Sequence, residues 1–332
     1  MKTPMDQLDN REGTAIRPGE QLDHYRIEGV VAQGRTATTF RATDLLTNRP
    51  VALEIPRPEI AADPVLLERF QRDEELDKSL DHPGLIKLIE KHGSGPGRGQ
   101  SYMVREWFEG ASLRDLLSQG KLAPERAIRI AASICGVAEY VHGHGIVLRD
   151  LEPDHILVGA DDRVKLIHIG VSSKFAARRL TFTKLSQVVG FSQYISPEEL
   201  LGKRADSRSD IYSIGVMLYE MLTGKLPFPG PRIDGRLSSY PVPPRELDPG
   251  ISPELQEVIY RALEREPKNR YATAREFARD LTHLDEVGVA DRPALHEWRK
   301  KDIPKWKKVV VYGTLALIPI VIFGLMLYLA KR

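Results

Sequence analysis

The spacing of the apolar residues changes once along this chain, near residue 110, and this change limits the folds open to it. Over residues 25–105, short apolar runs alternate with turn residues, which is typical of β-strands, and one helical stretch at 64–80 interrupts them. Over residues 112–284 the apolar residues recur at helical spacing. The sequence therefore predicts an α+β fold of two lobes, a small β-rich lobe at 25–105 and a larger α-helical lobe at 106–285.

The α-helical lobe is expected to contain four main helices and one long surface loop. The loop, at 227–253, is rich in proline, glycine and serine. The predicted helices are 124–142, 211–222, 254–263 and 273–284.

Composition excludes some kinds of protein. The 332 residues are 42% hydrophobic, enough for a sizeable core. The 48 Lys and Arg residues against 46 Asp and Glu give a net charge of +2, so we expect no nucleic-acid partner. The only cysteine, Cys135, excludes an intramolecular disulfide, fits a reducing compartment, and lies in an apolar helical run, so it is predicted to be a core residue.

The two ends of the chain differ in character. Residues 1–24 are predicted to form a disordered tail, since they are mostly polar and have no apolar stretch of the kind that a secretory signal needs. Residues 309–330 carry no charge and are long enough to cross a bilayer, so they are predicted to form a transmembrane helix. The linker at 286–308 ends in a basic run, whereas only Lys331 and Arg332 follow the span, and this bias predicts a single-pass protein with its large domain in the cytoplasm.

Five short segments occur in a fixed order in the α-helical lobe: Ile146-Val147-Leu148-Arg149-Asp150-Leu151-Glu152-Pro153, His168-Ile169-Gly170, Ser196-Pro197-Glu198, Asp210-Ile211-Tyr212-Ser213-Ile214-Gly215 and Pro267-Lys268-Asn269-Arg270-Tyr271. Protein Ser/Thr kinases have their motifs in the same order. Over residues 25–284 the chain therefore resembles that family, and is most similar to its bacterial membrane-bound members. The resemblance implies a bilobal protein-kinase fold, with ATP and Mg²⁺ as cofactors.

Positions that organise the fold agree with the family. The resemblance implies that Arg149 and Asp210 brace the catalytic loop, and that Glu198 and Arg270 form a buried ion pair. Gly215 permits close helix packing.

Positions that hold ATP and Mg²⁺ in the family are altered. Glu54 stands for the strand lysine and Glu152 for the catalytic-loop lysine, while His155 and His168 stand for the metal-binding asparagine and aspartate. Further departures are Leu148 for a histidine, Phe191 for a threonine, and Asp73 or Glu74 for the helix glutamate. The phosphate-covering loop, Ala32 to Ala37, keeps only Gly34 of its three glycines.

Two functions follow from this pattern. Phosphoryl transfer depends on positioning and on charge neutralisation by lysine and Mg²⁺. Their loss predicts a membrane-tethered pseudokinase, a regulatory or scaffolding module for cytosolic signalling proteins, among them an active kinase, with no bound cofactor. The alternative is an active ATP-dependent Ser/Thr kinase with non-standard sites. Asp150, at the catalytic-base position, and Ala52 and Leu157, at the positions that sandwich adenine, favour the alternative.

Several side chains carry further hypotheses. Arg105 is at the back of the adenine position, where it either pairs with Glu54 and fills the nucleotide pocket or extends to solvent. His155 and His168 either pair with Glu54 or Glu152, or bind a transition metal together with Asp150. Thr181 and Thr183, close to three basic residues, either accept phosphate or are solvated loop residues.

Overall fold

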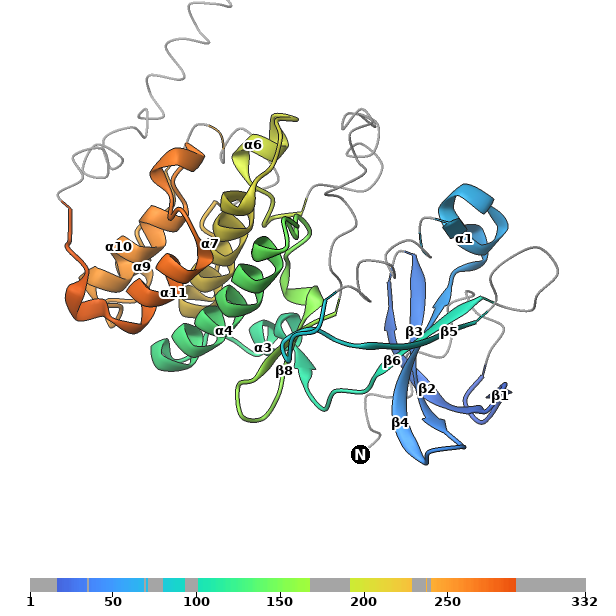
Figure 1. The fold of residues 1–332 in the computed structure, drawn as a ribbon. Coiled ribbons are helices and arrows are strands. Elements are labelled where there is room, and N and C mark those ends of the chain that lie inside the picture. Colours follow the sequence, from blue (N-terminus) through green and yellow to red (C-terminus); the bar gives the residue numbers. More distant parts are fainter. Residues whose placement is uncertain are drawn as a thin grey trace, which may run out of the picture.

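The chain folds into two lobes that lie side by side (Figure 1). The computed structural model describes residues 17–34, 36–68, 70, 80–92, 101–167, 192–228, 237 and 240–290. Within these ranges the first lobe is built around a β-sheet and the second around helices, so the predicted bilobal α+β fold is confirmed.

The first lobe contains an antiparallel six-stranded sheet with the strand order β1-β2-β3-β4-β6-β5. A short helix, α1 (Pro58–Ala62), follows β4. The strands are β1 (Gln21–Leu22), β2 (Tyr25–Gln33), β3 (Ala37–Asp44), β4 (Arg49–Pro56), β5 (Leu88–His92) and β6 (Tyr102–Glu106).

Side chains along β4 point alternately to the two faces of this sheet. Val51, Leu53 and Ile55 point into a small apolar core, which they share with Val104 of β6 and with side chains of β2 and β3. Successive strand residues point to opposite faces, so Ala52 and Glu54 lie on the other face of the sheet. That face carries several of the altered positions.

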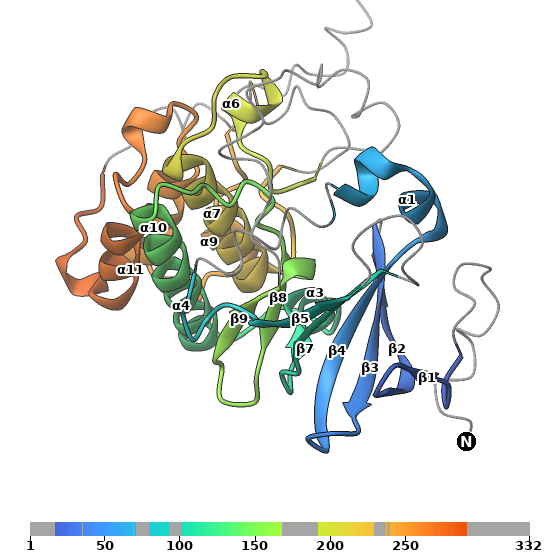
Figure 2. The same ribbon diagram turned by 45° about the vertical axis from the view of Figure 1, so that its right-hand side comes forward.

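The second lobe is mainly helical, and a three-stranded sheet of order β7-β8-β9 lies between its helix α4 and the first lobe (Figure 2). Its strands are β7 (Ala111–Ser112), β8 (Ile156–Val158) and β9 (Val164–Leu166). Its helices are α3 (Leu113–Ser118), α4 (Pro124–Gly143), α6 (Pro197–Leu200), α7 (Ser207–Thr223), α9 (Pro244–Leu247), α10 (Pro253–Ala262) and α11 (Ala274–Thr282), with 3-10 turns η2 (Pro153–His155), η3 (Pro267–Asn269) and η4 (Leu284–Glu286).

Helix α7 is the centre of the second lobe. Every residue from Ser209 to Tyr219 is buried, as expected for a helix that is covered on all sides. Gly215 lies where α7 crosses α10, and a Cβ at this position would come within 2.8 Å of the Ala262 Cβ. Cys135 of α4 is buried in the same core, which raises the pKa of its thiol and confirms the predicted core role.

The lobes are joined by specific contacts as well as by the chain. The Lys165 ammonium of β9 donates to the Glu106 carboxylate at the end of β6, and also to the backbone oxygen of Leu85 at 3.3 Å. The backbone N–H of Lys87 donates to the same Glu106 carboxylate at 2.9 Å. Hydrogen bonds thus connect residues 85–87, which lead into β5, and the end of β6 to the second lobe.

Predicted and observed helices agree closely, with two corrections. The stretch expected at 64–80 is helical at residues 64–68 and 70, while residues 69 and 71–79 lie outside the described residues. The correction is that a further short helix, α1, precedes it, with Pro58 in its first turn. The loop expected at 227–253 contains α9, which begins at Pro244 and buries that proline.

Other expectations fall outside the described residues. These are residues 1–16 of the tail expected at 1–24, the linker from 291 onward and the span at 309–330. The rest of the expected tail is ordered, since residues 17–24 include β1, which pairs with β2. Among the residues that the structure describes, none forms a helix with the length and apolar character that crossing a bilayer requires.

Candidate functional site

The first part of the site is an ion pair between two neighbouring strands. Ala52 of β4 is opposite Arg105 of β6 in the sheet register, and Glu54 is opposite Met103, so all four share one face. Arg105 Nε donates to Glu54 Oε2 at 2.9 Å. The predicted pairing of the two side chains is therefore present, and Arg105 does not extend to solvent.

Burial makes this pair energetically important. The side chains of Arg105 and Glu54 are 2% and 3% exposed. Removing one member of a buried pair leaves an uncompensated charge and costs about 3–5 kcal/mol. The guanidinium and the carboxylate thus depend on each other for burial at this position.

Asp210 of α7 fixes the backbone of the catalytic-loop segment through hydrogen bonds. Its carboxylate is fully buried and accepts hydrogen bonds from the backbone N–H groups of Leu148 and Arg149, both at 2.8 Å. These bonds hold Arg149 at φ +60°, a left-handed conformation that is costly for a residue with a Cβ. The position of Asp150, the next residue, follows from this constraint.

His142 is a functional neighbour that the sequence analysis missed. Its Nε2 donates to Asp210 Oδ2 at 2.7 Å from the last turn of α4. It follows an apolar helical run, and nothing in the local pattern distinguishes it from a solvated histidine. Leu148, which stands where the family has a histidine, is buried in the apolar core.

Two of the altered side chains, Glu152 and His155, come together with Asp150, the residue at the catalytic-base position. His155 Nδ1 lies 2.9 Å from the backbone oxygen of Asp150 and 3.6 Å from its Oδ2, while His155 Nε2 lies 3.9 Å from Glu152 Oε1. Glu152 Oε2 accepts a hydrogen bond from Ser192 Oγ at 2.8 Å. Ser192 is a second residue that the sequence analysis did not single out.

A buried ion pair supports the second lobe, as the resemblance implied. Arg270 donates from both terminal nitrogens to the two Glu198 oxygens at 2.7 Å. Burial alone would raise the pKa of Glu198, but the hydrogen bonds and charge of Arg270, with a bond from Ser209, hold that pKa below its ordinary value. Glu198 therefore remains ionised.

The remaining predicted positions fall into two groups. Gly34 ends the β2 side of an exposed turn, where its N–H donates to the Ala37 oxygen at 2.8 Å, and Ala52 and Leu157 are partly buried. Outside the described residues lie His168, Phe191, Thr181, Thr183, Asp73 and Glu74.

Comparison with known proteins gives a consistent result. The family model described as "Protein kinase domain" matches residues 25–281. Serine/threonine-protein kinase PknB from Mycolicibacterium smegmatis is 34% identical over 282 residues, which cover 83% of this chain and 45% of the relative. The probable serine/threonine-protein kinase SCO3848 from Streptomyces coelicolor is 34% identical over 264 residues, 77% of this chain and 39% of the relative. The chain thus spans less than half the length of these relatives.

Solved structures agree on the fold. The crystal structure of the Mycobacterium tuberculosis PknI kinase domain superposes with a TM-score of 0.62 and 21% sequence identity, and the match covers 82% of this chain and 100% of that domain. With the family model and the sequence relatives, the two-lobed architecture and the buried Glu198–Arg270 and Asp210 interactions lead to one conclusion. The chain belongs to the protein kinase family, within the group similar to the bacterial Ser/Thr kinase PknB.

Proposed function

We propose that this chain is a pseudokinase, a kinase-fold domain that regulates or scaffolds signalling proteins without transferring phosphate itself. The observation that carries the proposal is the buried Arg105–Glu54 pair. It puts a carboxylate where the family has the lysine that binds nucleotide phosphates. The guanidinium that neutralises this carboxylate is itself held inside the lobe.

The residues present do not fit ATP with Mg²⁺, the cofactors that the family implies. Mg²⁺ prefers hard oxygen ligands, whereas the metal-binding asparagine is replaced by His155. Glu152 adds a negative charge close to Asp150, where the family has a lysine. Negative charge near the triphosphate raises the free energy of binding instead of lowering it.

A second candidate function is an active Ser/Thr kinase with non-standard sites. The relatives at 34% identity are named as serine/threonine-protein kinases, and this favours the second candidate. Asp150, at the catalytic-base position, also favours it, since its loop is held by Asp210 as catalysis would require. The chemistry of the altered positions favours the first candidate.

Nucleotide binding separates the two functions. Thermal unfolding of the full chain is measured with ATP or ADP, each with Mg²⁺ or Mn²⁺. A ligand at about 100 times its dissociation constant adds about 2.7 kcal/mol of stability. The pseudokinase proposal expects no stabilisation and no transfer of labelled phosphate.

A matched variant keeps this negative result informative. The substitutions Glu54→Lys, Arg105→Met, Glu152→Lys, His155→Asn and His168→Asp together restore the family's residue types or an apolar pocket wall. This variant is expected to gain stabilisation by ATP with Mg²⁺. Phosphate transfer by the unaltered chain that disappears in Asp150→Asn would instead establish the active kinase.

We also propose that the domain is tethered to the cell membrane by residues 309–330, with cytosolic signalling proteins as partners. The support is in the sequence: an uncharged stretch with a basic run before it. An active kinase of the same cell is the partner class that a regulatory kinase fold suits best.

A further inference from the structure

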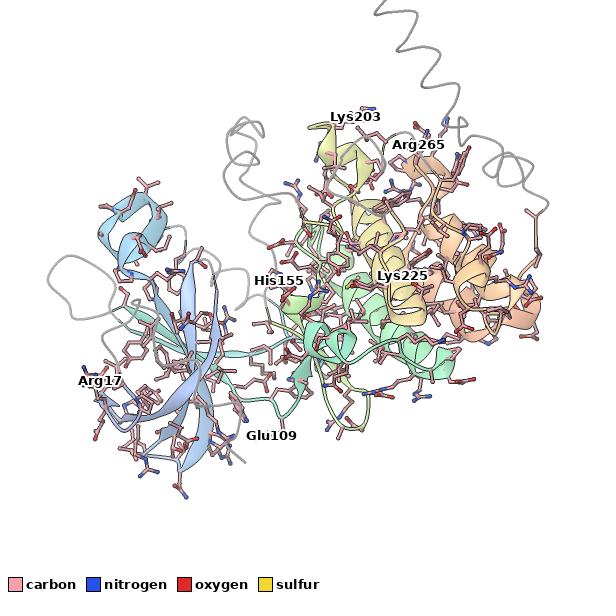
Figure 3. All side chains as sticks on the ribbon, turned by 180° about the vertical axis from the view of Figure 1, so that it is seen from behind. Arg17, Glu109, His155, Lys203, Lys225 and Arg265 are labelled. Atoms are coloured by element: carbon pink, nitrogen blue, oxygen red, sulfur yellow. The ribbon has the colours of Figure 1, made fainter. Side chains whose placement is uncertain are left out.

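Asp150, Glu152 and His155 form a cluster on the side of the second lobe that faces the β-rich lobe, where His155 is labelled in Figure 3. One candidate ligand atom from each residue lies within 4.8 Å of the other two. The turn η2 begins directly after Glu152 and returns His155 towards Asp150, so the grouping is set by the backbone. An imidazole nitrogen and two carboxylate groups are ligand types that divalent transition metals take.

The tautomer of His155 is determined by its backbone partner. Nδ1 lies 2.9 Å from the backbone oxygen of Asp150, and a carbonyl oxygen only accepts hydrogen bonds, so Nδ1 carries the proton. In the neutral ring, Nε2 is then the nitrogen with the lone pair, and it faces Glu152 Oε1. Metal-binding histidines commonly have this arrangement, with the other ring N–H donating to a carbonyl or a carboxylate.

Glu152 is oriented from outside the cluster. Ser192, 40 residues further along the chain, donates from Oγ to Glu152 Oε2 at 2.8 Å. The other oxygen, Oε1, is directed to His155. Ligating carboxylates are likewise held by outer hydrogen bonds. The arrangement therefore contains both ligand atoms and the groups that fix their orientation.

We propose that this cluster binds one divalent transition-metal ion of the Zn²⁺ type, through His155 Nε2 and a Glu152 oxygen, with the Asp150 carboxylate as third ligand. Tetrahedral coordination with bonds of about 2.0–2.2 Å places two ligand atoms about 3.3–3.6 Å apart, and Nε2 and Oε1, now separated by 3.9 Å, reach this spacing if the side chains approach by a few tenths of an ångström. Asp150 is half exposed, so its carboxylate can rotate the small distance required. Solvent completes the coordination.

Imidazole distinguishes this site from the Mg²⁺ site of the family. Mg²⁺ takes oxygen ligands in octahedral geometry, whereas imidazole with carboxylates suits Zn²⁺ and its neighbours. The competing arrangement is a protonated His155 that forms ion pairs with Asp150 and Glu152 and excludes any metal. The metal-site proposal does not depend on whether the chain transfers phosphate. The metal site and the pseudokinase function can therefore be contradicted independently.

Titration of the full chain tests the site. Purified protein is freed of metal by a chelator, and Zn²⁺ is then added in a calorimeter, with Mg²⁺ titrated separately. We expect one Zn²⁺ per chain with micromolar affinity and binding of Mg²⁺ at least 100-fold weaker. His155→Asn and Glu152→Gln are each expected to weaken Zn²⁺ binding at least tenfold.

Two further variants show whether the proposed geometry is responsible. Ser192→Ala removes only the outer hydrogen bond and is expected to weaken Zn²⁺ binding about 10-fold or more, as outer partners of metal ligands do. His144→Asn removes an exposed histidine that bonds the Tyr140 oxygen, away from the cluster, and is expected to leave the affinity unchanged. Circular dichroism confirms that each variant is folded.

Three results would overturn the proposal. The first is the absence of Zn²⁺ binding below about 100 μM, which leaves an ion-pair cluster only. The second is equal affinity in His155→Asn and the unaltered chain. The third is an equal loss of affinity in His144→Asn, which places the ion elsewhere.

Discussion

Arg105 is the largest of the fully buried side chains in the described part of the chain. Arginine is almost never buried without a partner, because taking its charge out of water costs several kcal/mol. Its partner Glu54 lies diagonally across β4 and β6, within the reach of a long side chain. Each of the two buried charges therefore depends on the other, and we expect the effects of substituting them on stability to be coupled.

Stability of single and double variants measures this coupling. Arg105→Met is expected to lower the free energy of unfolding by about 3–5 kcal/mol, since Glu54 then stays buried without its guanidinium. The double variant Glu54→Leu with Arg105→Met removes both charges, and should lose less than Arg105→Met alone. Urea unfolding of the unaltered chain, the single variants Glu54→Leu and Arg105→Met, and the double variant gives the coupling free energy. Additive losses would contradict a direct dependence between the two side chains.

The sequence predicted the Arg105–Glu54 contact but not the hydrogen bonds of His142 and Ser192. Glu54 and Arg105 lie in neighbouring strand motifs, and their charges are anomalous for buried strand positions, so a pair could be proposed from the sequence. His142 and Ser192 reach Asp210 and Glu152 across 68 and 40 residues. Such contacts depend on tertiary packing, and no local pattern encodes them.

At the scale of secondary-structure elements, the start of α6 carries a second buried acid. Glu199 closes a capping box with Ser196, whose Oγ donates to Glu199 Oε2 at 2.7 Å. Burial raises the pKa of Glu199 to about 7, with smaller contributions from the negative charges of Asp210 and Glu198. This carboxyl group holds its proton in the folded state at pH values where the unfolded chain has lost it.

The raised pKa of Glu199 predicts a pH dependence of stability. Between the ordinary glutamate value near pH 4.5 and about pH 7, the folded state binds more protons than the unfolded state, so stability falls as pH rises. The total loss is about 3 kcal/mol. Glu199→Gln keeps the capping box and should remove this slope, which urea unfolding from pH 5.5 to 8.5 measures. The control Glu125→Gln, at an exposed first-turn position of α4, should leave the slope unchanged.

Two glycines inside helices allow a matched test of packing. Gly215→Ala places a Cβ within 2.8 Å of the Ala262 side chain, so α7 and α10 must separate, and we expect a loss of about 1–3 kcal/mol. Gly136→Ala in α4 meets nothing within 4 Å and should stabilise the domain by up to about 1 kcal/mol, because alanine favours the helix. Thermal unfolding compares them. A stable Gly215→Ala variant would show that the α7–α10 contact adapts.

Helix positions were predicted well because each main helix has a strong local signal. For α10 and α11, Ser252 and Thr273 cap the first turn through side-chain hydrogen bonds, and apolar residues recur at helical spacing. Helix α9 was missed because four residues are too few to show a helical period, and because it begins at Pro244, the second of two consecutive prolines.

For the whole molecule, the contacts of Glu106 limit how the lobes move. Lys165 from the second lobe and the backbone of Lys87 share its carboxylate, and Leu85 forms a β-bridge with Leu166. Ile86 adds a backbone hydrogen bond to the Leu166 oxygen at 3.0 Å. These contacts join the two lobes, so motion between the lobes is expected to pivot about them.

The arrangement of the whole chain gives one prediction about location. Truncation after residue 290 removes the basic linker and the uncharged stretch at 309–330 but none of the described residues. The full chain should sediment with membranes and the truncated chain should remain in the supernatant, with the same melting temperature for the domain. A full chain recovered in the supernatant without detergent would contradict the tether.

The buried pair of Arg105 and Glu54 also bears on how this sequence could have diverged. A chain that changed only one of these positions would carry an uncompensated internal charge costing about 3–5 kcal/mol, a large share of the 5–15 kcal/mol that stabilises a typical domain. Most such intermediates would be lost. Among descendants of a common ancestor, an acid at position 54 should therefore be inherited together with a cation at position 105, and the two should rarely occur apart.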